Sequence, residues 1–435
     1  MIEKKLLVIT YYWPPSGGPA VQRWLSLTDE LVKLGWQIWV VTVDEKYATY
    51  QMTDTSFVDK INPSIKVYKT KTIEPFNFYK LLFGKKSIPA PGFSNEANPS
   101  FVKKFFRFIR GNLFIPDPRK YWKNFASKKA AELIKENNIN IIITAGPPHS
   151  THFIGEFLKR KLCVNWICDF HDLWTDVIYY KLLYHLPFVK KSDQKKEIQI
   201  LESCDKIFTV GEKYKEKLLS KTKNISPGKI HLIRIGFNDE ILQTTLINNQ
   251  NKFIISYIGS IADYYYPEIF FNALFIAKQN IKINLLVRFV GVVSPVISDL
   301  IKKYQLEDCV EFTGYVQHKK AISFLMQSTV LLLINPVTEN ESMIIPGKIY
   351  EYLAANKPII NITKKNSETA GIIAQCNAGK TFARHETQAL ANYLIDLFTE
   401  WKKNNFIVHN ADINEVKKFS RSAIALDLSN ELLQP

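Results

Sequence analysis

The feature that most constrains the fold is a series of short apolar runs alternating with helical patterns, and this series occurs twice along the chain. The first runs are Leu6–Thr10 and Gln37–Val43, and a helical pattern between them begins near Pro19 and ends at Gly35. Runs that are apolar throughout indicate strands buried on both faces, as in parallel sheets. Strands that alternate with helices in this way predict doubly wound α/β domains.

A polar, Asn-rich stretch over 238–252 separates the two series and is typical of a linker. We therefore predict a first domain over 1–237, with an irregular insertion at about 44–120, and a second domain over 253–410. A last helix is expected over 411–435. Two such domains in tandem would leave a deep cleft between the carboxyl ends of their sheets, where ligands bind in such folds.

Composition limits the class of protein. The five cysteines are odd in number and form no C-x-x-C motif, which predicts a reduced, cytoplasmic protein without a disulfide framework or structural zinc. No run approaches the roughly 20 apolar residues of a spanning helix, and the apolar run near Met1 is too short for a signal peptide. The net charge of +16 calls for a polyanionic neighbour: nucleic acid, anionic lipid or a phosphorylated substrate.

Much of this charge lies in residues 101–129, which carry nine basic residues against one acidic residue, Asp117. At about 100° per residue, two sets of side chains separate on a helix. The apolar set is Phe101, Phe105, Phe108 and Ile109, and the basic set is Lys103, Lys104, Arg107 and Arg110. This pattern predicts an element that lies on an anionic membrane; the alternative is a core-packed helix with a solvated basic face. No zinc finger, helix-turn-helix or aromatic-rich recognition strand accompanies the charge, so we expect no nucleic-acid partner.

The strongest local pattern is Ile345–Ile362, where a helix is expected to open at Pro346–Gly347, at the carboxyl edge of the second sheet. Lys348 and Glu351 lie one turn apart on one face of this helix. A diphosphate at the helix start would meet Lys348 and the helix dipole. A ribose one turn further on could place both hydroxyls on Glu351. The alternative is an ordinary surface ion pair between the two residues.

Two adjacent glycines, Gly17 and Gly18, lie between the first strand and its helix. Without Cβ atoms they let a backbone approach a ligand closely, and the helix start favours an anion or a sugar hydroxyl. A plain tight turn is the alternative. The segment lacks the G-x-G-x-x-G pattern, so a nicotinamide or flavin cofactor is not indicated.

Taken in order, several short motifs resemble those of family 4 glycosyltransferases of the GT-B architecture, in the subset that builds bacterial surface polysaccharides. The resemblance extends over nearly the whole chain. The matching pieces are Pro14–Gly18 with Arg23, Gly146–Ser150, Asp169–Trp174, Gly236–Asn238, Tyr257–Ser260, Phe312–Val316 and Pro346–Ala354.

The resemblance implies two Rossmann-like doubly wound domains facing across a deep cleft, with the C-terminal helix crossing back to the first domain. It also implies retaining transfer of a sugar from a nucleotide-sugar, most readily a UDP- or GDP-sugar, to a lipid-linked or nascent glycan acceptor. The enzyme is expected to be cytoplasmic and peripheral on the inner face of the plasma membrane. By the resemblance, Glu351 would bind the ribose, Gly347 and Lys348 would flank the diphosphate, Tyr315 and Val316 would lie in the loop that meets the base, and Gly17 and Gly18 would close over the donor.

The chain departs from the family pattern at two places. The family often has two glutamates separated by seven residues, but the first position is Met343 here, so Glu341 or Glu339 in the same loop would have to serve. The basic pair that often follows the first strand of the second domain is absent from Gly259–Tyr266, and Arg288, Lys348 or Arg23 could supply the charge. These gaps leave open a catalytically weak nucleotide- or glycan-binding protein of the same fold.

Three polar residues after strands of the first domain are candidates for orienting or deprotonating an acceptor hydroxyl: His149, His171 and Asp172. The alternatives are hydrogen-bonded loop histidines and, for Asp172, a helix N-cap or turn residue. No Asp-x-Asp motif is evident where a metal would be held. We therefore expect no required metal and no cofactor, with helix amides and basic side chains neutralising the diphosphate.

Overall fold

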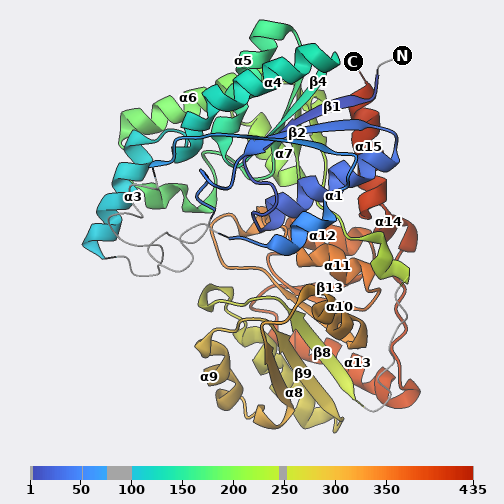
Figure 1. Cartoon of the computed structure of the whole chain (residues 1–435). Coiled ribbons are helices and arrows are strands. Elements are labelled where there is room, and N and C mark those ends of the chain that lie inside the picture. The colour runs from blue at the N-terminus through green and yellow to red at the C-terminus, as the bar shows by residue number, and fades with distance from the viewer. Residues whose placement is uncertain (1–2, 51, 76–99, 244–251, 435) are drawn as a thin grey trace. The chain divides into compact units, whose positions relative to one another are not determined.

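The structure, a computed structural model, describes residues 3–50, 52–75, 100–243 and 252–434. It divides the chain into two compact units. The first unit is Met1–Arg234 with Ile424–Pro435, and the second is Ile235–Ala423. Each unit is built around its own parallel sheet, as the alternating pattern predicts (Figure 1).

Within the described residues, the first unit has a seven-stranded sheet in the order β3-β2-β1-β4-β5-β6-β7. Its strands are β1 (Lys5–Ile9), β2 (Gln37–Val43), β3 (Lys66–Thr70), β4 (Ile141–Gly146), β5 (Asn165–Phe170), β6 (Lys206–Thr209) and β7 (Ile230–Leu232). Its helices are α1 (Pro19–Lys33), α3 (Phe101–Leu113), α4 (Lys123–Asn137), α5 (His152–Leu162), α6 (Pro187–Ser203), α7 (Glu212–Leu219) and α15 (Arg421–Leu433). The strand order reverses between β1 and β4, so the loops after these two strands border the crevice where such sheets bind ligands.

The prediction that the insertion at about 44–120 is irregular is wrong for one segment. Residues 66–70 form β3, which pairs in parallel with β2 from Trp39↔Lys66 to Val43↔Thr70. The strand is short, lies at the edge of the sheet and reads Lys-Val-Tyr-Lys-Thr, so it lacks the continuous apolar run of a central strand. Part of the insertion, residues 76–99, lies outside the described residues.

The second unit has a six-stranded sheet within the described residues, in the order β10-β9-β8-β11-β12-β13. Its strands are β8 (Phe253–Ile258), β9 (Leu285–Val290), β10 (Val310–Gly314), β11 (Val330–Ile334), β12 (Ile359–Ile362) and β13 (Gly379–Phe382). Its helices are α8 (Glu268–Asn280), α9 (Pro295–Lys303), α10 (His318–Gln327), α11 (Lys348–Ala354), α12 (Glu368–Gln375), α13 (Thr387–Asn404) and α14 (Ile413–Lys417). One face of this sheet packs against α8, α9 and α13, and the other against α10, α11, α12 and α14. The order reverses between β8 and β11, which places the ends of these strands at the second ligand-binding edge.

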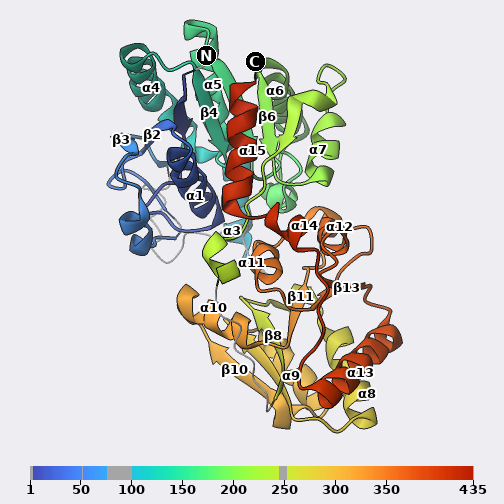
Figure 2. The same ribbon diagram turned by 90° about the vertical axis from the view of Figure 1, so that its right-hand side faces the viewer.

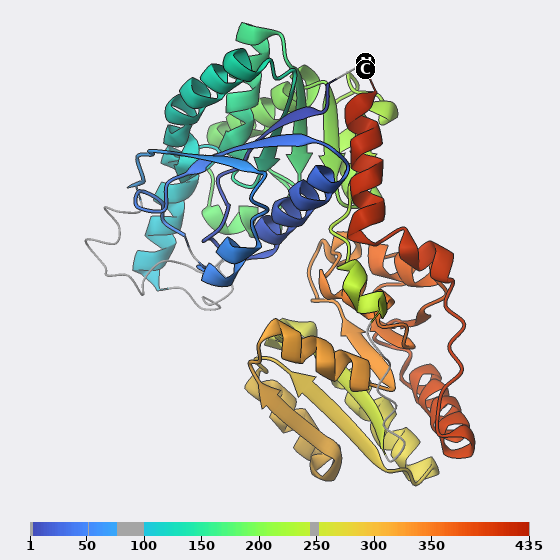
Figure 3. The same cartoon turned by 45° about the vertical axis from the view of Figure 1, so that its right-hand side comes forward.

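The boundary at the end of the second domain lies further along the chain than the predicted residue 410. The second unit continues to Ala423, because Val416 and Phe419 pack into its core. The first unit contains the last helix from Ile424 onward. Ile424, Leu428 and Leu432 of α15 join the core beside α1, and Trp36 Nε1 donates a hydrogen bond to Ser429 Oγ at 2.9 Å (Figures 2 and 3).

None of the helices in the described parts of the chain is long and apolar enough to cross a membrane.

Candidate functional site

A half-buried lysine lies at the carboxyl edge of the second sheet. Lys348 Nζ is 3.8 Å from the centroid of the Tyr257 ring, and a Cβ added to Gly259 would lie only 2.7 Å from it. Gly259 follows β8 directly and has a φ of +119°, which favours glycine. Burial lowers the pKa of Lys348 to about 7, and the charge of Glu351 opposes this shift. A desolvated ammonium at this edge is suited to binding an anion.

Helix α11 holds this lysine in place through its inner face. Ile349, Tyr350 and Leu353 are buried, and Tyr352 Oη accepts a hydrogen bond from the backbone N–H of Ile258 at 2.8 Å. Tyr352 Oη also donates to the carbonyl oxygen of Leu332 at 3.3 Å. Because one hydroxyl joins α11 to both β8 and β11, Lys348 and Glu351 are fixed at the point where the strand order reverses.

Glu351 is paired with a residue that the sequence analysis missed. Its Oε1 lies 2.8 Å from Nε2 of His318, the first residue of α10. The Glu351 side chain is partly exposed, and a carboxylate oxygen that accepts one hydrogen bond can accept another. A ribose diol could therefore bind Glu351 without displacing His318.

The loop after β10 lies on the same side of the sheet. Gly314 has a φ of +67°, Tyr315 is 83% exposed, and Val316 is half-buried against the core. Gly347 is exposed, and a Cβ added there would meet no atom within 4 Å. The His318–Glu351 pair thus brings the loop from Gly314 to His318 next to α11.

Two predicted donor-binding residues have other partners, which corrects their assignment. Glu341 is buried, and its Oε1 lies 2.6 Å from Nη1 of Arg384 and accepts a hydrogen bond from Thr363 Oγ1 at 3.1 Å. Arg288 lies within β9 rather than at its end, and its Nε is 2.8 Å from Glu311 Oε2 on the neighbouring β10. Both side chains therefore hold the fold together, and Lys348 is the cation of the predicted set that lies at this edge.

The sequence contains a signal for the missed residues at this edge. Asn335 directly follows β11, Thr363 directly follows β12, and Arg384 comes two residues after β13. Arg384 Nη2 donates to the carbonyl oxygen of Asn335 at 2.6 Å, so the three residues and Glu341 form one polar cluster. Polar residues that follow successive parallel strands meet at one sheet edge, and this rule identifies them.

In the first unit, Gly17 and Gly18 lie in the loop after β1. The Gly17 N–H donates to the carbonyl oxygen of Met52 at 3.0 Å. Gly18 is the N-cap of α1 with a φ of +106°, and a Cβ added there would meet open space. The backbone of Gly18 therefore requires glycine and leaves room for a close approach.

Arg23 does not reach this loop's surface, which corrects its predicted role. The side chain is fully buried, and its Nη2 and Nε donate to the two carboxylate oxygens of Asp169 at 2.9 and 3.2 Å. Trp24 Nε1 donates to the same carboxylate at 2.8 Å, and Arg23 Nη1 donates to the carbonyl oxygen of Arg234 at 2.8 Å. This network joins α1 to β5, so Arg23 is structural in this fold.

The three candidate acceptor-side residues follow β4 and β5, which are neighbours in the sheet. His149 is buried and stacks on Trp174, with ring centroids 5.3 Å apart. Burial lowers the pKa of His149 to about 3, so the ring is neutral and a weak base at neutral pH. His171 and Asp172 are half-buried, and burial also lowers the pKa of His171. His171 and Asp172 are therefore better placed than His149 to meet a ligand.

Helix α3, which Figure 1 shows as a ribbon of the first unit, differs from the prediction in which side chains are exposed. Three of its aromatic residues face solvent: Phe101 is 84% exposed, and Phe105 and Phe108 are also exposed. Arg107 is 3% exposed, while Ile109 and Arg110 are half-buried. Burial and the nearby charge of Arg119 lower the pKa of Arg110. Of the predicted basic membrane contacts, only Lys103 and Lys104 are exposed; Arg107 and Arg110 point inward.

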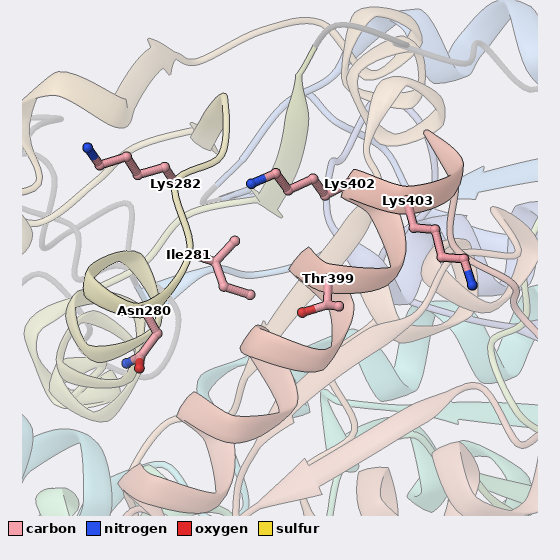
Figure 4. A pocket seen from close by; sticks show the side chains of 6 residues that line it. All are labelled: Asn280, Ile281, Lys282, Thr399, Lys402 and Lys403. Carbon is pink, nitrogen blue, oxygen red and sulfur yellow. The ribbon is translucent and has the colours of Figure 1, made fainter.

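A pocket of about 560 Å³ lies at the opposite, amino-terminal edge of the second sheet (Figure 4). It is lined by Asn280, Ile281, Lys282, Thr399, Lys402 and Lys403. Lys402 extends from α13 toward the segment that carries Lys282, while Lys403 extends away (Figure 4). Its lysines do not converge, and it is remote from Lys348. Across the described residues, no group of three or more His, Cys, Asp or Glu side chains could hold a metal ion.

Comparisons with known proteins agree with this architecture. The profile described as Glycosyltransferase Family 4 matches residues 88–241, and that described as Glycosyl transferases group 1 matches residues 238–413. Among curated proteins, none matches the chain.

Several solved structures share the fold over the whole chain. Anabaena Alr3699/HepE in complex with UDP has a TM-score of 0.64 at 12% identity and covers 98% of this chain and 99% of that one. A glycosyltransferase from Rickettsia africae ESF-5 has a TM-score of 0.61 at 15% identity and covers 100% of both chains. The lipopolysaccharide outer core galactosyltransferase WaaB, in its apo form, has a TM-score of 0.59 at 10% identity and covers 98% of both chains.

The two profiles match in tandem, and each overlaps the corresponding structural unit. The chain therefore belongs to the family 4 glycosyltransferases and has the GT-B architecture.

Proposed function

We propose that this glycosyltransferase binds a nucleotide-sugar at the carboxyl edge of the second sheet and transfers the sugar with retention of configuration. The observation that carries the proposal is the Lys348 ammonium, held beside Gly259 and Tyr257 one turn before Glu351. In this proposal Lys348 binds the diphosphate, and Glu351 accepts hydrogen bonds from the ribose. The loop from Gly314 to Val316 then lies next to the base.

Lys348 would take the place of the basic pair that this chain lacks after β8. Its ammonium occupies the space beside Gly259, the first residue of the segment in which the family often has the basic pair. A charged hydrogen bond to the leaving diphosphate strengthens as negative charge develops there, so Lys348 also favours bond cleavage. Because an ammonium already supplies this charge, we propose that transfer requires no metal, and activity in excess EDTA tests this.

A uridine nucleotide is the favoured donor class. Anabaena Alr3699/HepE, which shares the fold, has been solved with UDP, and this supports a UDP-sugar over a GDP-sugar. The acceptor we propose is a lipid-linked or nascent glycan of a cell-surface polysaccharide. The fold likeness to the lipopolysaccharide galactosyltransferase WaaB supports this acceptor class.

We also propose that the enzyme works at the inner face of the plasma membrane. The support is α3, whose exposed Phe101, Phe105 and Phe108 lie beside Lys103 and Lys104. An exposed aromatic face with adjacent lysines is typical of helices that lie in the interface of an anionic bilayer.

A catalytically weak nucleotide-binding protein of the same fold is the second candidate. It is favoured by Met343 at the place of the family's first glutamate, and by the ion pair that ties Glu341 to Arg384. The two candidates predict the same nucleotide binding and differ in turnover.

Thermal unfolding with UDP, GDP, ADP and CMP tests the donor class, because a ligand of the native state raises its stability. We expect the largest shift with UDP. Donor hydrolysis or transfer to a lipid-linked acceptor then separates an enzyme from a binding protein. No shift with any nucleotide would refute the proposed site.

A further inference from the structure

Helix α3 carries most of its apolar side chains on the outside, and a second exposed apolar segment lies against it. This segment is residues 182–188, in which Leu182, Tyr184, Leu186 and Phe188 are exposed, Phe188 by 70%. Together with Phe101, Val102, Phe105, Phe108 and Leu113 of α3, they form what we name the two-segment surface. Exposed apolar side chains gathered from two segments indicate a binding surface rather than scattered residues.

The two segments are fixed to each other (Figure 1). Gly111 of α3 lies so close to Leu183 that an added Cβ would be 2.3 Å from the Leu183 carbonyl oxygen. Asn112 Nδ2 donates to the carbonyl oxygen of Tyr184 at 3.1 Å, and Asn112 Oδ1 accepts from the N–H of Leu186 at 2.8 Å. The C-terminal end of α3 and residues 182–188 are therefore held together within the first unit.

The charges around the surface have one sign. Lys103 and Lys104 on α3, Lys181 in the second segment, and Lys190 and Lys191 just after it are exposed. The sequence has no acidic residue between Asp176 and Asp193, nor between Phe101 and Pro116. Exposed apolar side chains with neighbouring lysines, on two segments whose sequences carry no carboxylate, complement a bilayer in which anionic head groups cover an apolar interior.

We propose that α3 and residues 182–188 dock together on an anionic lipid bilayer, with residues 182–188 as a second anchor. The inference deepens the membrane location in the proposed function and rests on it. The second anchor follows the loop after β5 that carries His171 and Asp172. Docking would therefore hold this edge of the first sheet near the membrane and raise the local concentration of a lipid-linked acceptor.

Flotation of the full chain tests the second anchor, with phosphatidylcholine vesicles prepared with and without phosphatidylglycerol. The paired change Leu182→Ser and Phe188→Ser should weaken binding to the anionic vesicles at least tenfold, because two apolar side chains no longer enter the interface. The matched control is Phe406→Ser with Val408→Ser, which removes two exposed apolar side chains from the second unit and should bind as wild type does.

Charge reversal gives an independent test of the same segment. Lys190→Glu with Lys191→Glu should weaken binding to anionic vesicles at least about 30-fold, because the loss of each lysine's charge alone costs about fivefold. Lys402→Glu with Lys403→Glu reverses an adjacent exposed pair on the second unit and should have no effect. All four variants should keep the wild-type thermal shift with UDP, which reports a folded second unit, and the wild-type tryptophan fluorescence, which reports a folded first unit.

Several results would overturn the inference. Both variants within 182–191 could float as the wild type does, while the variant Phe101→Ser with Phe105→Ser fails to float. In that case α3 is the anchor, and residues 182–188 do not bind the membrane. Equal binding to vesicles without phosphatidylglycerol would contradict the anionic partner. If the wild type is a dimer in solution and the Leu182→Ser with Phe188→Ser variant is a monomer, the surface binds a second copy of the chain and not a bilayer. If the wild type does not float, the membrane location fails as well, while UDP binding and turnover still test the enzyme by themselves.

Discussion

Lys348 combines two properties that make nucleotide binding depend on pH. Its pKa in the free protein is lowered to about 7, and a bound diphosphate favours the charged form, so the complex holds the proton more tightly. Below pH 7 the ammonium is already formed and affinity is highest. Above pH 7 binding must take up a proton, and affinity falls by up to about tenfold per pH unit.

Calorimetric titration with UDP between pH 7 and pH 9 measures this dependence, because the charge on UDP is constant above a phosphate pKa of about 6. Lys348→Arg is the matched control, since a guanidinium stays charged over this range. We expect a falling affinity for the wild type and a flat profile for the arginine variant. A flat wild-type profile would show that Lys348 does not meet the diphosphate.

The His318–Glu351 pair makes a second prediction at this scale. If Glu351 binds the ribose, Glu351→Ala should weaken UDP binding by about 10- to 150-fold, the cost of a lost charged hydrogen bond. His318→Ala should weaken it only a few-fold, because His318 orients the carboxylate, and His318→Gln should restore affinity by keeping a donor near Nε2. The corresponding ligand control is 2′,3′-dideoxyuridine diphosphate: neither alanine variant should change its affinity. Equal losses with both ligands would indicate damage to α11 instead.

Two helical glycines show how packing between elements decides the effect of one substitution. A Cβ at Gly155 in α5 would lie 1.9 Å from Nε1 of Trp166, a buried residue of β5 that donates to Thr144 Oγ1 at 2.8 Å. A Cβ at Gly371 in α12 would meet nothing within 4 Å. Gly155→Ala should therefore lower the free energy of unfolding by about 1–3 kcal/mol. Gly371→Ala should raise it by about 0.5–1 kcal/mol, because alanine favours the helix.

Urea unfolding of each unit measures the two changes. Trp401 is the tryptophan of the second unit, and the others belong to the first. The fluorescence of a Trp401→Phe background therefore reports unfolding of the first unit for Gly155→Ala. The part of the signal that this background lacks reports unfolding of the second unit for Gly371→Ala. Shifts of the same sign for both glycine variants would contradict the packing described here.

How far the elements follow from the sequence depends on burial. The central strands β1, β4 and β8 are predictable because both faces are covered and the run is apolar throughout. The edge strand β3 and the inward face of α3 are not. Periodicity separates Arg107 from Phe105, but it does not say which of the two faces the protein, and here Arg107 is buried while Phe105 is exposed. The buried pair of Arg23 with Asp169 joins residues 146 positions apart, which no local pattern reveals.

For the whole molecule, tandem β/α series predict two units, and the family profiles and both sheets agree with that prediction. The placement of Lys348 and Glu351 beside each other could be predicted because they lie on one short helix, where spacing alone places them together. The ion pairs of Glu341 with Arg384 and of Arg288 with Glu311 could not be predicted, because the partners come from other elements. Sequence spacing thus predicts a site within one element better than a site assembled from several.

The central claim is that the donor diphosphate binds at Lys348. Calorimetric titration of the protein with UDP and, separately, with uridine tests this claim most directly. We expect Lys348→Ala to weaken UDP binding by about 10- to 150-fold while uridine binds as it does to the wild type. Lys357→Ala, which removes another partly buried lysine just beyond the far end of α11, should leave both affinities unchanged. Wild-type UDP affinity in the Lys348→Ala protein, or an equal loss for UDP and uridine, would contradict the account.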